Sequence, residues 1–229
     1  MRPLRFGALW LLGCVLFGAQ AASALSITFD LNFEFSNGTP PAGGTPWVTV
    51  TIDDAADAVG ANGVRVTVSN VGLVGTENVT ELSLNLDPAL DPTALTFIAV
   101  DMSAVGSPAG DPNDFSFSTG VDAFQADGDG KFDMLLDLPP PPGQAAARFQ
   151  AGETIVFDLD LGAPLSASDF DFSSAPGGGQ GTFKAAAHVQ GIGEGGEDSG
   201  WIGPVPEPGA AWLLALGLGG LLASRSRRV

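Results

Sequence analysis

The sequence has little of several residue types on which catalytic and nucleic-acid-binding sites depend. Its 229 residues include one Cys, one His, no Tyr and only nine Lys or Arg. This leaves almost no material for thiol, imidazole or zinc chemistry. Against the nine bases stand 26 Asp or Glu, which gives a formal net charge of -17. Binding to nucleic acid needs Lys and Arg to displace counterions from phosphates, so we expect no nucleic-acid partner.

The first 24 residues have the organisation of a secretory signal peptide. A basic start precedes an apolar stretch over residues 6–18, and Ala22 and Ala24 supply the small side chains that signal peptidase recognises. The apolar stretch has about 13 residues, whereas a membrane-spanning helix needs roughly 20. We therefore expect an N-terminal signal helix that signal peptidase removes after Ala24. The single cysteine, Cys14, leaves with it, so no disulfide can help the exported protein fold.

Residues 206–229 form a second short segment at the other end of the chain. Pro206, Glu207 and Pro208 precede a 14-residue apolar run, residues 210–223, that is rich in Leu and Gly. A short hydrophobic helix with a basic end stops in a membrane with its Arg side chains on the cytoplasmic side. We therefore expect a C-terminal hydrophobic helix that anchors the protein transiently in the inner membrane. The basic end consists of Arg225, Arg227 and Arg228.

This combination of Pro-Glu-Pro, apolar helix and terminal Arg cluster resembles the PEP-CTERM sorting signal of Gram-negative bacteria. In that family an exosortase recognises and cuts the chain near Pro-Glu-Pro, releasing the protein toward the outer surface, often in bacteria that make exopolysaccharide. The resemblance covers about 25 of the 229 residues. It implies an exosortase as processing partner and exopolysaccharide as a neighbour outside the cell, and it is silent on what the exported domain does.

Between these ends, apolar and polar side chains alternate with the period of two that half-buried strands require. The clearest segments are 26–35, 47–52, 64–68, 82–86 and 154–161, and weaker ones occur at 95–100, 132–138, 170–172 and 182–189. Gly- and Pro-rich turn clusters separate these segments. Buried parallel strands would be apolar at every position, so the alternation favours antiparallel pairing. We predict an all-β domain over residues 25–190, an antiparallel two-sheet β-sandwich or jelly roll.

The acidic residues are concentrated in this middle part of the chain. Residues 25–205 contain four Lys or Arg and 25 Asp or Glu, a formal charge of -21. Such a surface stays soluble and attracts divalent cations. Asp53 and Asp54 are interpreted as solvated turn residues. Residues 191–205 are rich in Gly and acids, with little apolar content before Trp201, and are predicted to be a mobile linker between the domain and the sorting signal.

One acidic segment has the composition of a calcium site. Asp127, Asp129 and Asp133 would supply carboxylates and Lys131 its backbone carbonyl, while the intervening glycines let the chain curl around an ion. Asp122 or Asp137 could complete the set of ligands. A β-turn with solvated aspartates, leading into a strand at Phe132, explains the same residues equally well. The sequence leaves both interpretations open, so calcium is the one cofactor it suggests.

No catalytic site stands out. His188 has no neighbouring His or Cys, which is typical of a structural histidine, and no Gly-x-Ser-x-Gly motif is present. We therefore predict a non-enzymatic, exported protein of the cell envelope or extracellular matrix. A carbohydrate-binding module is the alternative if a sheet face exposes two or more aromatics such as Trp47 and Trp201. A secreted hydrolase would require His188 or a pair of carboxylates to converge in a pocket.

Overall fold

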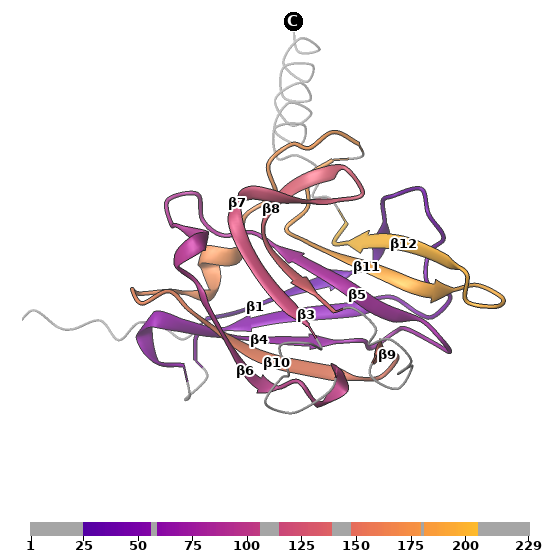
Figure 1. Ribbon diagram of the computed structural model, residues 1–229, viewed down its shortest axis with the longest axis horizontal. Helices are drawn as coiled ribbons and strands as arrows, with labels where there is room; N and C mark the ends of the chain where they lie inside the picture. Colours follow the sequence, from indigo (N-terminus) through magenta and orange to yellow (C-terminus); the bar gives the residue numbers. More distant parts are fainter. Residues whose placement is uncertain (1–24, 56–58, 106–114, 139–147, 180, 206–229) are drawn as a thin grey trace, which may run out of the picture.

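The computed structural model describes residues 25–55, 59–105, 115–138, 148–179 and 181–205, and their regular structure is almost entirely β-strand (Figure 1). Both predicted terminal helices lie outside these residues, as do the processing residues Ala22, Ala24, Pro206, Glu207, Pro208, Arg225, Arg227 and Arg228. No helix within the described ranges is long and apolar enough to span a membrane. The strands are β1 (Ser26–Leu31), β2 (Phe33–Glu34), β3 (Val48–Asp53), β4 (Gly63–Ser69), β5 (Asn78–Leu84), β6 (Thr96–Asp101), β7 (Ser116–Ala126), β8 (Asp129–Asp137), β9 (Phe149–Gln150), β10 (Thr154–Asp160), β11 (Ala185–Ile192) and β12 (Asp198–Gly203). Single turns of 3-10 helix form η1 (Gly60–Asn62), η2 (Pro92–Ala94), η3 (Ser103–Val105) and η5 (Ala167–Phe170).

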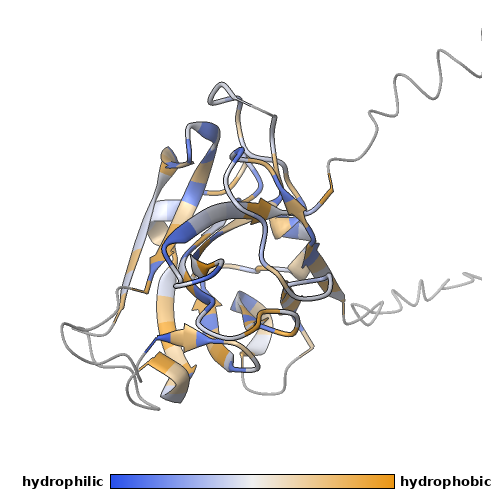
Figure 2. Cartoon of the chain, turned by 90° about the vertical axis from the view of Figure 1, so that its right-hand side faces the viewer, coloured by the Kyte–Doolittle hydropathy of each residue, from blue (hydrophilic) through white to orange (hydrophobic). Residues whose placement is uncertain are grey.

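The strands form two antiparallel sheets, which confirms the predicted all-β sandwich. One sheet has five strands in the order β1-β3-β4-β10-β6, and the other has seven, in the order β2-β12-β11-β5-β8-β7 with β9 paired to β5. Neighbouring strands are antiparallel throughout both sheets. Hydrophobic and hydrophilic residues follow one another along the strands in Figure 2. This is the pattern expected when each sheet buries only one face.

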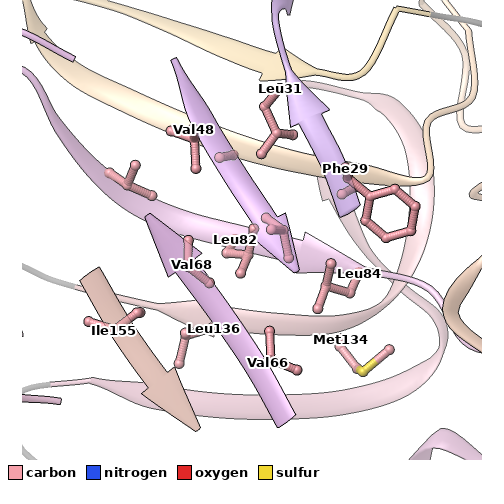
Figure 3. Close-up of a cluster of buried hydrophobic side chains, with 14 of the residues drawn as sticks. Phe29, Leu31, Val48, Val66, Val68, Leu82, Leu84, Met134, Leu136 and Ile155 are labelled. Carbon is pink, nitrogen blue, oxygen red and sulfur yellow. The ribbon is translucent and has the colours of Figure 1, made fainter. Parts of the chain in front are cut away.

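The main core lies between the two sheets. Val66, Val68 and Ile155 reach it from the five-stranded sheet, and Leu82 and Met134 reach it from the seven-stranded sheet (Figure 3). All five side chains are buried. Because they occupy alternate positions, the residues between them face outward. A second, smaller cluster is formed by Phe35, Ala126, Phe132, Phe183, Ala186 and Trp201.

The predicted strand over residues 26–35 is in fact divided between the two sheets. β1 ends at Leu31, and β2 pairs with β12 in the other sheet. At the crossing, the backbone N–H of Asn32 donates to the carbonyl of Gly203 at 3.0 Å. Phe29 and Leu31 therefore belong to the main core, whereas Phe33 is 38% exposed. An uninterrupted alternation in sequence cannot show where a chain changes sheets.

The predicted linker over residues 191–205 is corrected by the structure, since much of it is sheet. β11 extends to Ile192, and β12 follows after a short turn and pairs with it. Trp201 of β12 is only 8% exposed. The folded domain therefore continues to Gly203. Residues 170–172 are corrected too, because Phe170 ends the 3-10 helix η5 and no strand follows there.

Truncation of one core side chain should destabilise the whole domain. Phe157 of β10 is buried and its ring stacks on that of Phe97, with the centroids 4.8 Å apart. We expect Phe157→Ala to lower the free energy of unfolding by about 3–5 kcal/mol, because it leaves a cavity between the sheets. Urea denaturation of residues 25–205 measures this. Val121→Ala, at a residue that is 69% exposed, is the control and should change stability by no more than about 0.5 kcal/mol. Equal effects of the two variants would contradict this assignment of the core.

Candidate functional site

The predicted calcium segment is a tight hairpin between β7 and β8. Asp127 and Gly128 have positive φ angles of 50° and 80°. Ala126 and Asp129 face each other across the turn. Two consecutive positive φ angles are typical of a type I′ turn, for which Asp-Gly is a favoured pair. The backbone here therefore follows the β-turn interpretation of the segment.

The oxygen atoms proposed as calcium ligands are directed to different partners. Asp129 is 3% exposed, and its carboxylate lies so close to Gly179 that a Cβ at that position would not fit. The carbonyl of Lys131 accepts a hydrogen bond of 3.0 Å from the backbone N–H of Ala175. In the ranges that the structure describes, no three His, Cys, Asp or Glu side chains are grouped so that they could hold a metal ion. The structure thus does not bring Asp127, Asp129 and Asp133 together as a metal site.

Asp133 instead joins the bulge of β7 to the segment that follows β5 through its carboxylate. Its Oδ2 accepts from the backbone N–H of Leu86 at 3.1 Å, and its Oδ1 accepts from the N–H of Asp122 at 2.9 Å. Asp122, suggested above as an additional ligand, therefore faces Asp133 through its amide. The N–H is available because β7 bulges between Thr119 and Phe124. Bulges of this kind redirect the backbone locally.

Two cavities lie at the surface of the domain. The first, of about 260 Å³, is lined by Asp87, Leu90, Val121 and Asp122, with Asp133 in its wall. The second, of about 330 Å³, lies against Phe183, Lys184, Pro204 and Val205. Asp133 hydrogen-bonds two residues that line the first cavity, Leu86 and Asp122. His188 lines neither cavity.

His188 lies in a row of side chains on the outer face of the seven-stranded sheet. It faces Trp201 on β12 and Glu81 on β5. Its ring stacks on that of Trp201, with centroids 4.9 Å apart and an angle of 11° between the planes. Its Nδ1 lies 3.2 Å from Thr80 Oγ1 and 3.5 Å from Glu81 Oε1. The His188 ring is thus in contact with side chains of β5 and β12.

Two carboxylates are adjacent in the same row. Glu81 faces Asp137 on β8. The pKa of Asp137 is raised, mainly by partial burial and further by the negative charge of Glu81. Perturbed carboxyl groups are common at active sites, but structural neighbours produce them too. Neither His188 nor Asp137 lines either of the two cavities described above.

The aromatic side chains do not form a displayed platform. Trp47 and Trp201 are 7% and 8% exposed. Trp47 donates from Nε1 to the carbonyl of Gly43 at 2.9 Å, so its polar edge is already hydrogen-bonded within the domain. Phe33 is the only aromatic among the exposed large hydrophobic side chains of the described residues. A row of exposed aromatics, which would favour sugar binding, is absent from this part of the chain.

The sequence patterns did not predict the roles of some residues at these sites. The neighbouring positions of Glu81 and Asp137 depend on strand register, which no short motif reveals. Asp54 was interpreted as a solvated turn residue, yet its carboxylate accepts two backbone hydrogen bonds, from Leu25 and Ala167. The only feature of the sequence that could have indicated this role of Asp54 is the pair of acidic residues, 53 and 54, at the end of an alternating segment.

Comparisons with known proteins leave the family open. No protein-family model and no curated protein matches the sequence. Among solved structures, the chain is similar to biomass-sensing modules of Rsgi-like proteins of Clostridium thermocellum, which are described as resembling the family 3 carbohydrate-binding module of the cellulosome. The identity is 13%, the match covers 73% of this chain and 93% of that one, and the TM-score is 0.28. A likeness this weak carries no argument about function.

The role of Asp133 can be separated from calcium binding by substitution. Asn has one acceptor oxygen in place of two, so Asp133→Asn should leave one backbone N–H without its partner and cost about 1–3 kcal/mol. Asp127→Asn removes the same charge but suits a type I′ turn, and it should be nearly neutral. Thermal melting with and without calcium checks both variants. A calcium-dependent rise in Tm that both substitutions abolish would instead support the calcium site.

The raised pKa of Asp137 predicts a pH-dependent effect on stability. Its ordinary value is 3.8, and a higher value in the folded state means that the ionised carboxylate disfavours folding above that pKa. Asp137→Asn should therefore raise Tm at pH 7, and the gain should shrink as the pH falls toward 3.8. Asp101→Asn is the matched control. Hydrogen bonds from Ser103 lower the pKa of Asp101, so this variant should give no gain at pH 7. A pH-independent effect of Asp137→Asn would contradict the assignment.

Proposed function

We propose that this protein is an exported, non-enzymatic component of the cell envelope or extracellular matrix, sorted by a C-terminal PEP-CTERM signal. Signal peptidase removes residues 1–24. The apolar run over residues 210–223 then holds the protein at the inner membrane until an exosortase cuts near Pro206. The β-sandwich is thereby released to the outer surface or the medium.

The observation that carries this proposal is the position of the sheets relative to the two predicted cuts. β1 begins at Ser26, just after Ala24, and β12 ends at Gly203, just before Pro206. The last described residue is also held in place, because the N–H of Val205 donates to Asn32 Oδ1 at 3.2 Å. Both cuts therefore leave the described strands and both hydrophobic clusters intact. A domain with this arrangement can lose residues 1–24 and the segment that follows the cut near Pro206 without losing a described strand.

The proposal includes no catalysis, and the contacts of two polar side chains support this part of it. His188 is engaged with Thr80 and Trp201. The Asp133 carboxylate is occupied by backbone N–H groups. A carbohydrate-binding module comes second, since Trp47 and Trp201 are packed rather than displayed. The formal charge of -21 over residues 25–205 favours a hydrated, soluble domain that acidic polymers reach only when cations screen it.

Processing can be tested in a Gram-negative host that carries an exosortase. Intact-mass spectrometry of the exported protein should show an N-terminus at Leu25 and loss of the C-terminal segment near Pro206. Replacing Glu207 by Ala should leave the C-terminal segment attached and the protein in the membrane fraction, because the recognised motif is gone. Pro204→Ala, two residues before the motif, is the matched control and should be processed normally. Full-length protein in the cytosol, uncut at both ends, would refute the proposal.

A further inference from the structure

Leu25 is fastened to the end of β3 by hydrogen bonds in both directions. Its backbone nitrogen donates to Asp54 Oδ1 at 2.6 Å, and the backbone N–H of Asp54 donates to the Leu25 carbonyl at 3.1 Å. The other carboxylate oxygen of Asp54, Oδ2, accepts from the N–H of Ala167 at 3.1 Å. Ala167 is the first residue of η5 and is fully buried. One oxygen of Asp54 is thus bound to the domain and the other is directed at the nitrogen of Leu25.

That nitrogen changes its chemistry if the chain is cut after Ala24. Hydrolysis of the Ala24–Leu25 bond consumes one water, leaves a carboxylate on Ala24 and frees the amine of Leu25. At neutral pH this amine takes up a proton, since its ordinary pKa is about 7.7–8.0. We propose that Asp54 is a binding site for this new α-ammonium group, which it holds as an ion pair. The inference rests on the proposed function, because that function places the cut at Ala24.

The other charged side chains at this end of the domain are engaged with other groups, so Asp54 is the partner that we assign to the amine of Leu25. Asp53 faces Ser26 across β1 and β3, but its Oδ1 accepts from the N–H of Ala55. Asp169 of η5 directs its Oδ2 to the N–H of Ser166. Arg65, which faces Asp53 on β4, forms a two-point ion pair with Asp158 on the far side.

The surroundings of the new ammonium group are therefore acidic. Residues 25–205 have only four Lys or Arg for 25 Asp or Glu, so the cut adds one cation to a domain that has few. Opposite charge at this distance favours the protonated amine.

The pair forms only when Leu25 is the first residue. If Ala24 remains, the nitrogen of Leu25 is a neutral amide, and the charged amine is that of Ala24, one residue earlier in the chain. The hydrogen bond to Asp54 is possible in both cases, so a comparison of the two forms isolates the charge. The pair lies at an exposed position, so its effect should be that of a surface ion pair.

The test uses residues 25–205, which contain every described strand, prepared with defined N-termini. The first protein has a free amine at Leu25, the second is acetylated there, and the third retains Ala24. NMR titration of the free amine should give a pKa about 0.2–0.7 unit above its ordinary range, the size expected of an exposed ion pair. Asp54→Asn should return that pKa to the ordinary range. Asp30→Asn is the matched control, because it removes an exposed carboxylate of β1. It should leave most of the pKa shift of the amine in place.

Thermal melting provides a second measurement. An amine whose pKa is raised in the folded state stabilises the protein below about pH 7.7 and loses that effect as the pH rises through the raised value. The free-amine protein should therefore melt above the acetylated one at pH 6.5 and level with it at pH 10. In Asp54→Asn the two forms should melt together at both pH values.

The possible outcomes separate this inference from the proposed function. An ordinary amine pKa that Asp54→Asn does not change, or equal melting of the free and acetylated proteins at pH 6.5, would overturn the role of Asp54. These proteins are prepared with chosen ends, so their result does not depend on how a cell processes the chain. An exported protein that begins elsewhere than Leu25 would instead contradict the proposed function.

Discussion

Burial of apolar side chains between two antiparallel sheets is the interaction on which the described domain depends. The described residues contain no cysteine, so no covalent cross-link supplements the core. Each strand gives alternate side chains to that core, and the sheets supply the backbone hydrogen bonds that their neighbours need. The row containing His188 lies on the face of the seven-stranded sheet that this alternation leaves outside the main core.

The excess of acid over base shapes how the domain uses its carboxylates. With so few cations available, several Asp and Glu side chains accept backbone N–H groups. Buried Glu77 accepts from the backbone N–H groups of Ala42 and Val74, and Asp133 accepts from those of Leu86 and Asp122 in the same way. Such hydrogen bonds hold in place the backbone segments that supply the donors. Much of the acidity is thus structural, and a dense acidic segment is a poor guide to a metal site in this chain.

The sequence predicted what depends on local periodicity and missed what depends on position in space. Alternation located β3, β4 and β10 to within a residue or two, because one buried face leaves a period of two. It could not show that the chain changes sheets at Asn32, since both halves of the segment alternate. β12 was missed because its Gly and acidic neighbours have the composition of a linker. The acidic residues were found as candidates, but their partners depend on register and loop packing, which single-residue patterns do not encode.

The pairing of β2 with β12 joins one of the first described strands to the last described one. The seven-stranded sheet therefore cannot be completed until the chain has been synthesised as far as Gly203. Sheets built from such distant segments have high contact order and close slowly. For a chain that is exported, as we propose, slow closure of this sheet would leave time to cross a membrane before folding is complete. The topology thus makes the edge formed by β2 and β12 a late part of the fold, whereas the five-stranded sheet needs no strand beyond β10.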